Sequence, residues 1–295
     1  MKPNVIPIFN VEKSAEAANP ARIENLADEY LFPPDKPLEI RIARSARELH
    51  DAYHLVYNQY CKIGYQIEND SKIRFTPHFA LPTSHTFIAL SHGEVAATLT
   101  MVIDGALGLP MEKEYPEEIQ LLRRKSGALL AEISCLVTRR SRDLTLLLQL
   151  FYAAYIYALH RHKVSDFCVA IAPEHQSFYR HAMLLEQIGP VKEYALINHM
   201  RTVAMRLNLP SAEQRYHKAH SMRKMLGRFF LGKEDLQQIG RNLKHPDQSA
   251  LQARLEFARA YLDRNHLPAA VTQHIDDAFR EALLTEESNN LALAS

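Results

Sequence analysis

The sequence predicts an α/β (α+β) fold in which a mixed central sheet is flanked by helices and followed by a C-terminal helical extension. Between residues 38 and 210, segments with a hydrophobic period of two alternate with segments of helical period. A clear hairpin signal lies at 86–104, where a His-Gly turn joins two apolar runs. Strand signals stop after Pro210 and helical patterns continue. We therefore expect a flexible segment at 1–37, a mixed-sheet domain at 38–210 and a helical extension at 211–295.

The expected order up to residue 210 is strand, helix, strand, strand, helix, strand, helix, strand, helix, strand, strand. The first strand is LEIRI, and the first helix begins after the N-cap candidate Ser45 and stops at Gly64. A polar loop at 66–84 separates this helix from the hairpin. The later elements are a helix at 116–127, a strand at 129–138, a helix from near Asp143, a strand at 166–172, a helix at 174–189 and two strands around Asn198 and His199. In the extension, three or four helices are expected, with breaks near Gly232, Pro246 and Pro268.

Composition indicates a soluble, cytoplasmic protein with no nucleic-acid partner. The formal net charge is +1, so no global charge imbalance calls for DNA or RNA. The first residues lack the apolar core of a secretory signal, and the three cysteines form no CxxC pair, which fits a reducing compartment. The apolar run 144–160 is shorter than the roughly 20 residues that a membrane-spanning helix needs. It is expected to be a buried helix.

One stretch, LLAEISCLVTRRSRDLT (129–145), combines a carboxylate with a basic end. Glu132 lies inside an apolar run, and Arg139, Arg140 and Arg142 follow it with no glycine among them. A glutamate in such a strand can simply face an edge or form a salt bridge. Likewise, the arginines can form a solvated turn that precedes a helix beginning near Asp143. The residues alone leave both alternatives open.

Several motifs resemble, in the same order, those of the FeeM-type N-acyl amino acid synthases. They are GYQIEN, RFTPHFALPTSHTFIAL, EVAATLTMVID, GLPMEKEYPEEIQLLRRKSGALLAEISCL and APEHQSFYRHAMLLEQIGP. The resemblance covers residues 38 to 208 and implies the GNAT-like acyl-CoA N-acyltransferase fold for the domain at 38–210. It implies transfer of a fatty acyl group from acyl carrier protein to the amine of an amino acid. The extension is not covered.

The resemblance also implies roles at the centre of the site. Glu132 would bind the ammonium of the acceptor and take its proton, and Tyr179 would protonate the leaving thiolate. The alternative for Tyr179 is simple core packing beside Phe178. The gap between two separating central strands, where backbone N–H groups meet the thioester oxygen, would be lined by Cys135, Leu136 and Val137.

The basic turn bears on the identity of the acyl donor. In coenzyme A-dependent GNAT enzymes this turn is Q/R-x-x-G-x-G/A, because backbone amides close on a pyrophosphate. Here it reads RRSRDLT. Arg139, Arg140 and Arg142 are therefore expected to contact the phosphate of acyl-phosphopantetheine and its acidic carrier protein, with acyl-coenzyme A as the alternative donor. A second basic stretch, Ser211 to Lys233, supports carrier docking, and peripheral contact with a membrane is its alternative.

The acceptor and acyl pockets are less well marked. The residues expected there are Tyr57, Tyr60, Tyr65, Arg74, Ser134 and His175, with Arg74 facing the acceptor carboxylate. The helix at 144–160 and the strand at 166–172 could line an acyl tunnel or form plain core. No bound cofactor and no metal are expected, because His50 and His54 have no third ligand at a recognisable spacing.

Three other functions remain open. An acyl-homoserine lactone-type autoinducer synthase would carry an arginine where Cys135 stands and a tryptophan, and this chain has no tryptophan. A coenzyme A-dependent N-acetyltransferase is disfavoured by the missing glycines. A non-catalytic GNAT-like module that binds a carrier protein is the third. The oligomeric state is not predicted.

Overall fold

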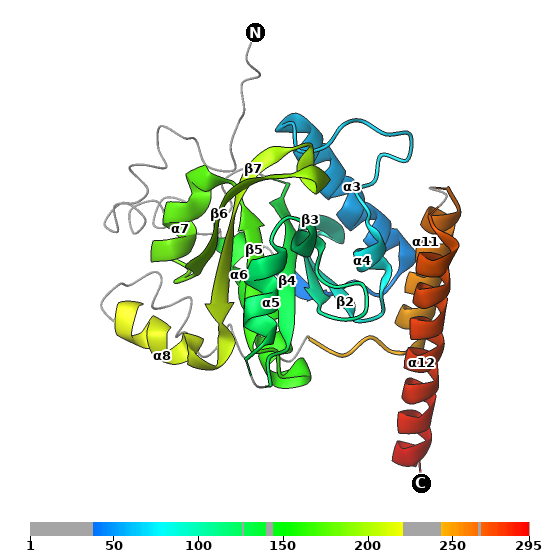
Figure 1. The fold of residues 1–295 in the computed structure, drawn as a ribbon. Coiled ribbons are helices and arrows are strands. Elements are labelled where there is room, and N and C mark those ends of the chain that lie inside the picture. Colours follow the sequence, from blue (N-terminus) through cyan, green and yellow to red (C-terminus); the bar gives the residue numbers. More distant parts are fainter. Residues whose placement is uncertain (1–37, 126, 140–143, 221–242, 265–266, 295) are drawn as a thin grey trace.

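The computed structural model describes residues 38–125, 127–139, 144–220, 243–264 and 267–294. Within these ranges a seven-stranded sheet has the order β1-β2-β3-β4-β5-β7-β6 (Figure 1). Its strands are β1 (Leu38–Ile42), β2 (Ser84–Ser91), β3 (Glu94–Ile103), β4 (Leu130–Thr138), β5 (Asp166–Ile171), β6 (Glu186–Tyr194) and β7 (Met200–Asn208). Only β4 and β5 pair in parallel. The sheet is therefore mixed, as predicted.

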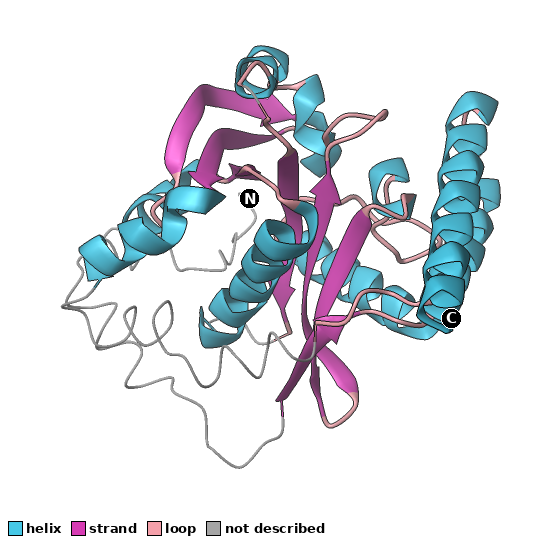
Figure 2. Ribbon diagram, turned by 90° about the horizontal axis from the view of Figure 1, so that it is seen from below, coloured by secondary structure: helices cyan, strands magenta, loops and turns pink. Residues whose placement is uncertain are grey.

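Helices cover both faces of this sheet (Figure 2). They are α3 (Ala46–Lys62), α4 (Pro77–Ala80), α5 (Pro116–Arg123), α6 (Leu144–Tyr157), α7 (Gln176–His181), α8 (Leu209–His220), α11 (Gln248–Arg264) and α12 (Ala269–Ala294). One core cluster joins α6 to residues such as Phe87 and Leu99, and a second joins α3 and α11 to Ile88 and Val102. None of the described helices is both long and apolar enough to cross a membrane.

Two irregularities of β4 shape the centre of the sheet. Pairing of β4 with β5 stops after Glu132 and Cys168, and no further pairs join the two strands within the described ranges. Along β3 the register shifts between Thr98, which faces Val137, and Thr100, which faces Ser134. The extra residue in β4 forms a bulge, with Cys135 in the left-handed region at a φ of 55°. The strands therefore separate at the point where β4 bends.

Most of the predicted elements are confirmed. The Ser45 side chain accepts a hydrogen bond from the Glu48 N–H at 3.2 Å and caps α3. In the hairpin turn, His92 and Gly93 have φ values of 54° and 78°, as a type I′ turn requires. α11 and α12 begin shortly after Pro246 and Pro268. The predicted break at Gly232 and the segment 1–37 lie outside the described residues, and the division into domains stays a prediction.

Two predictions about local structure are wrong. The helix expected at 174–189 ends at His181, because Leu184 adopts a φ of 55° and the chain continues as β6. The segment 66–84, expected to be a polar loop, contains α4 and several buried side chains, including Phe79 and Arg74. This segment is held between α3 and α11, so its polar sequence does not indicate exposure.

A histidine cluster joins the segment before α11 to the sheet. His85 of β2 is 1% exposed, and its ring centroid lies 5.0 Å from that of His162 and 6.3 Å from that of His245. Arg161 and Arg254 add positive charge nearby. The His85 ring nitrogens have no hydrogen-bond partner in the described part of the chain. Burial, followed by these positive neighbours, lowers the pKa of all three histidines, that of His162 to about 4.

Stability is expected to fall in mild acid because of this cluster. The histidine pKa is about 6.5 in an unfolded chain and lower in the fold, so the unfolded state binds more protons below that pH. The contribution is complete above about pH 6.5 and is lost as the pH falls through the folded pKa. Urea unfolding at pH 7.5 and pH 5 should show a larger loss for the wild type than for His162→Gln. The exposed His217→Gln should behave like the wild type, and equal losses in all three proteins would contradict the prediction.

Candidate active site

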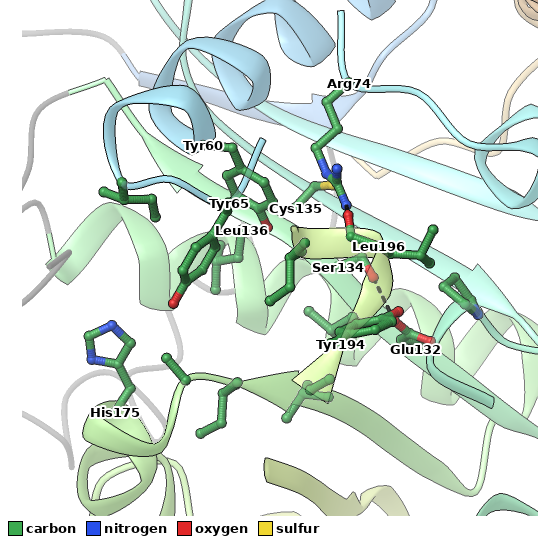
Figure 3. Close-up of a pocket in the computed structure, with 18 of the residues that line it drawn as sticks. Tyr60, Tyr65, Arg74, Glu132, Ser134, Cys135, Leu136, His175, Tyr194 and Leu196 are labelled. Atoms are coloured by element: carbon green, nitrogen blue, oxygen red, sulfur yellow. Dashed lines mark hydrogen bonds between the residues drawn. The ribbon is translucent and has the colours of Figure 1, made fainter. Parts of the chain in front are cut away.

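A pocket opens where β4 and β5 separate (Figure 3). It is formed by the adjoining parts of β4 and β5, the C-terminal end of α3, α4, α7 and the turn after β6. It encloses about 1020 Å³ of empty space, including its open mouth. Most of the lining is apolar or aromatic, so its few polar groups stand out.

Glu132 is the last residue of β4 that pairs with β5, and it lines this pocket. It is 2% exposed. Its Oε2 accepts a hydrogen bond from the Met111 N–H at 2.7 Å. Its Oε1 accepts one from the Ser134 hydroxyl at 2.9 Å, and Figure 3 shows this second bond. Burial raises the pKa of Glu132 to about 7, while the two hydrogen bonds act in the opposite direction. The carboxyl group can therefore gain or lose a proton near neutral pH.

Arg74 reaches the same pocket from the segment between α3 and α4. It is 9% exposed. Its Nη1 donates to the Gln66 side-chain oxygen at 2.8 Å and its Nη2 to the Leu196 carbonyl at 2.7 Å. The Nε atom is buried with no partner, and within the described ranges no carboxylate forms an ion pair with this guanidinium. A buried cation without an anion is costly and suits an anionic ligand.

Glu132 and Arg74 thus place a buried titratable carboxyl group and a buried guanidinium in a single pocket, whose lining also includes the partly buried Glu174. They are not ion-paired to each other, nor does Glu132 pair with any other cation among the described residues. Figure 3 shows them on different walls, with Tyr194 beside the glutamate. Tyr194 is 5% exposed, and burial raises its pKa well above the usual value. A ligand with an ammonium and a carboxylate would match both walls.

Three further tyrosines, Tyr60, Tyr65 and Tyr179, line the pocket. Tyr60 and Tyr65 contact edge-to-face with ring centroids 5.6 Å apart, and the Arg74 guanidinium carbon lies 4.9 Å from the Tyr60 centroid. Tyr179 of α7 is half-buried and packs against Phe178. Burial raises the pKa of both Tyr65 and Tyr179 to about 12. Their phenols therefore remain protonated at neutral pH and can donate.

The bulge of β4 brings Cys135 and Leu136 to the pocket wall. A bulge takes its extra residue out of the regular ladder, which makes the local N–H groups candidates for binding an oxygen of a ligand. The Cys135 thiol is 4% exposed, and burial raises its pKa to about 11. A protonated thiol is a poor nucleophile, so the pocket is suited to direct transfer rather than to an acyl-cysteine intermediate.

The structure brings most of the predicted site residues together. The pocket is lined by Glu132, Ser134, Cys135, Leu136, Tyr60, Tyr65, Arg74, His175 and Tyr179. Tyr57 and Val137 are buried elsewhere, and the Tyr57 hydroxyl accepts a hydrogen bond from the Asn69 N–H at 3.2 Å. In the described ranges no group of three His, Cys, Asp or Glu side chains could hold a metal ion.

The basic turn is only partly described. Arg139 is half-exposed beyond the pocket, where it pairs with Glu94 at 2.6 Å and donates to the Val95 carbonyl. Arg140 and Arg142 lie outside the described residues, as does most of the second basic stretch. Of that stretch, Arg215 pairs with Glu186 at 3.1 Å.

Sequence reasoning missed several residues of the pocket. Tyr194 is the last residue of β6 and Leu196 lies in the turn after it, and both are more than fifty residues beyond Glu132 in the chain. The Met111 N–H is a backbone donor and leaves no side-chain signal. The one available signal was the LPME motif itself, which precedes the glutamate strand and contains Met111.

This pocket and the fold that forms it are those of an acyltransferase enzyme. The chain belongs to the FeeM family: the family model described as "N-acyl amino acid synthase FeeM" matches residues 51–208. The structure of FeeM, an N-acyl amino acid synthase from uncultured soil microbes, is 27% identical with a TM-score of 0.56 over 63% of this chain and 99% of that chain.

Two further solved structures are more distant. The acyl-homoserine lactone synthase LasI is 16% identical, with a TM-score of 0.47 over 63% of this chain and 96% of its own. A GNAT-family acetyltransferase from Streptococcus pneumoniae is 12% identical, with a TM-score of 0.41 over 59% of this chain and 99% of its own. A search of curated proteins found no match.

Proposed function

We propose that the protein transfers a fatty acyl group from the thioester of acyl carrier protein to the α-amine of an amino acid. The observation that carries this proposal is that two buried charged side chains line one pocket without contacting each other. Glu132 is titratable near neutral pH, and Arg74 has no carboxylate partner among the described residues. The relative FeeM is an N-acyl amino acid synthase, which supports the same acceptor class.

The acceptor is held as a zwitterion between the two charged side chains. Its carboxylate binds the Arg74 guanidinium, whose Nε has no other partner among the described residues. Its ammonium lies against Glu132. An amine without a carboxylate could use only one of these contacts. The proposal therefore predicts selection of α-amino acids over simple amines.

Glu132 acts as the general base. With a pKa of about 7 it is partly ionised at neutral pH and takes a proton from the ammonium, directly or through water. The free amine then forms the C–N bond with the thioester carbonyl carbon, and the carbonyl electron pair moves onto oxygen. We assign stabilisation of that oxyanion to the N–H groups at the Cys135 bulge, where the register of β4 is irregular.

Collapse of the intermediate breaks the C–S bond and restores the carbonyl. The nitrogen releases its second proton to solvent, and the departing thiolate takes a proton from the Tyr179 phenol. The Tyr179 phenolate then regains a proton from solvent, and Glu132 releases to solvent the proton it took from the ammonium. That phenol is protonated at neutral pH because burial raises its pKa to about 12. The products are an N-acyl amino acid and the free thiol of the carrier.

The donor assignment is supported by the sequence of the turn after β4. RRSRDLT has no glycine to close around a pyrophosphate, whereas a single phosphate on a carrier protein can be bound by arginine side chains. Arg139 is already paired with Glu94, so within this turn Arg140 and Arg142 become the more important candidates.

Tyr179→Phe is expected to lower kcat/KM for acyl transfer by about 10²-fold, the low end of the usual contribution of a general acid, because the thiolate loses its acid while the ring packing is kept. Steady-state release of carrier thiol measures this. Tyr57→Phe removes a buried hydroxyl outside the pocket and should leave kcat/KM nearly unchanged. If Tyr179→Phe were as active as Tyr57→Phe, the role of Tyr179 as acid would be wrong.

The function itself is tested by product analysis. Purified protein is incubated with palmitoyl-acyl carrier protein or palmitoyl-coenzyme A, each with the twenty amino acids or with S-adenosylmethionine, and acyl amides are sought by mass spectrometry. The proposal predicts an N-palmitoyl amino acid with the carrier-bound donor. A product formed only from coenzyme A would overturn the donor, and an acyl-homoserine lactone would overturn the acceptor. Binding of the carrier without thiol release would indicate a non-catalytic module.

A further inference from the structure

The hydrogen bond from Met111 to Glu132 depends on a loop that has little regular structure. Met111 lies in a short 3₁₀ helix, Pro110–Lys113, between β3 and α5. Its N–H is 2.7 Å from Glu132 Oε2, and it is one of only two donors to this carboxylate in the described part of the chain. The position of this loop therefore sets part of the environment of the proposed base.

A single arginine ties the two ends of this loop together. Arg123, the last residue of α5, donates from Nε to Asp104 Oδ2 at 2.6 Å and from Nη2 to Asp104 Oδ1 at 2.8 Å. Its two Nη groups also contact both carboxylate oxygens of Glu112. Asp104 directly follows β3, and Glu112 directly follows Met111. Arg123 thus spans the loop from its first residue to the residue beside the donor.

The geometry around Glu112 leaves little freedom. Its Oε2 also accepts a hydrogen bond from the Leu109 N–H at 3.3 Å. Gly108 has a φ of 68°, and a Cβ at this position would lie 2.4 Å from the same oxygen. Glycine is therefore needed both for the backbone conformation and for the approach of the carboxylate. The loop backbone is closed tightly over the Arg123–Glu112 contact.

We infer that Arg123 is a positioning residue for acyl transfer, which holds the Met111 N–H against Glu132 by joining Asp104 to Glu112. The inference rests on the proposed role of Glu132 as base. Arg123 is not among the residues that line the pocket. Its effect passes through the loop to the carboxylate.

Loosening of this loop would change the protonation of Glu132. The Met111 hydrogen bond lowers the pKa of Glu132 against the effect of burial. If the loop loosens, this donor is lost or lengthened, and the charged carboxylate loses stabilisation. The pKa of Glu132 then rises above about 7. A loss of stability alone would lower the amount of folded enzyme without moving this pKa.

The test compares two arginines with matched contacts. Lysine cannot reproduce the planar fork that joins two carboxylates, so Arg123→Lys weakens the connection while keeping the charge. Arg41 is the control: its Nη groups contact Glu48 at 2.9 and 2.8 Å and its Nε contacts Glu39 at 2.9 Å. Glu48 lies in the first turn of α3, whereas the pocket residue Tyr60 lies in its last turn.

The readout is the pKa of Glu132, titrated by ¹³C NMR of carboxyl-labelled glutamate and assigned by the signal missing in Glu132→Gln. Arg123→Lys is expected to raise this pKa by about 1 unit, and Arg41→Lys to leave it unchanged. Glu112→Gln removes one of the two carboxylates that bind Arg123 and should also raise the pKa of Glu132. This variant replaces Arg123→Lys in the test if Arg123→Lys folds poorly.

An unchanged Glu132 pKa in both Arg123→Lys and Glu112→Gln would overturn the inference, because the packing of Leu109 and Met111 would then suffice to hold the loop. A shift in Arg41→Lys equal to that in Arg123→Lys would overturn it as well. This result is independent of the proposed function: full activity of Glu132→Gln would refute the base, while the NMR titration would still decide whether Arg123 controls the carboxyl group.

Discussion

Glu132→Gln is expected to lower kcat/KM for acyl transfer by about 10²- to 10⁴-fold, the usual contribution of a general base. Glutamine keeps the shape of the side chain and can still accept the hydrogen bond from Met111, but it cannot take a proton from the ammonium. The loss should appear in the release of carrier thiol at saturating donor, with the thermal unfolding midpoint close to that of the wild type.

The control is another buried acid. Asp166 is 2% exposed and bonded to Arg206 at 3.0 Å, outside the pocket. Asp166→Asn should cost stability, because it weakens a buried charged contact, and should leave kcat/KM of the folded enzyme nearly unchanged. If Glu132→Gln kept more than about a tenth of wild-type kcat/KM, proton removal by this residue would not be part of the mechanism.

The dependence of kcat/KM on pH below neutrality is expected to follow the ionisation of Glu132. The base must be ionised, so kcat/KM should rise with pH and level off above the pKa of Glu132, about 7. In the Glu132→Gln variant the rise of kcat/KM up to about pH 7 should be absent. The acceptor amine ionises in the same way with both enzymes, so this difference reports Glu132.

Arg74→Gln is expected to raise the KM for the amino acid by about 10- to 100-fold, with a smaller change in kcat. A charge-assisted hydrogen bond to a carboxylate contributes roughly 1.5–3 kcal/mol, and this contact exists before and during the reaction. The measurement compares the preferred amino acid with its methyl ester. Wild type should favour the free acid, and the variant should lose that preference.

The matched control for this variant is Arg254→Gln. Arg254 is 7% exposed and bonded to the Leu81 carbonyl and the Thr86 hydroxyl, with no carboxylate partner among the described residues. It lies outside the pocket. Arg254→Gln should therefore change stability but not the preference for the free acid. An Arg74→Gln enzyme that still distinguishes acid from ester as the wild type does would place the carboxylate elsewhere.

The pattern of the sequence predicts the fold well wherever local signals agree with the tertiary structure. Ser45 caps its helix, and the His92–Gly93 turn supplies the two positive φ values of the hairpin. The segment 182–189 was misread because its apolar spacing suits a helix, whereas pairing of β6 with β7 decides the outcome. That pairing is a hairpin in which Tyr194 lies opposite Met200 and Glu186 opposite Arg206, so the start of β6 is decided by the returning strand and not by its own apolar spacing.

The site was predictable where a charged residue interrupts an apolar run. Glu132 stands out in this way, and Arg74 was identified although its burial was not expected. Tyr194 and the Met111 N–H could not be found, because they approach Glu132 only after β6, β7 and the loop before α5 have packed. The role of Arg139 as a carrier contact stays a prediction: its charge is visible in the sequence, whereas its ion pair with Glu94 on the neighbouring strand shows only in the structure.

The most direct test of the account is a crystal structure of the protein with an N-acyl amino acid bound. The account predicts that the product carboxylate lies within about 3 Å of the Arg74 guanidinium, that the amide nitrogen lies beside Glu132, and that the acyl carbonyl oxygen faces the backbone at Cys135. A carboxylate bound at any other cation, or an amide on the far side of the pocket from Glu132, would contradict the proposed mechanism.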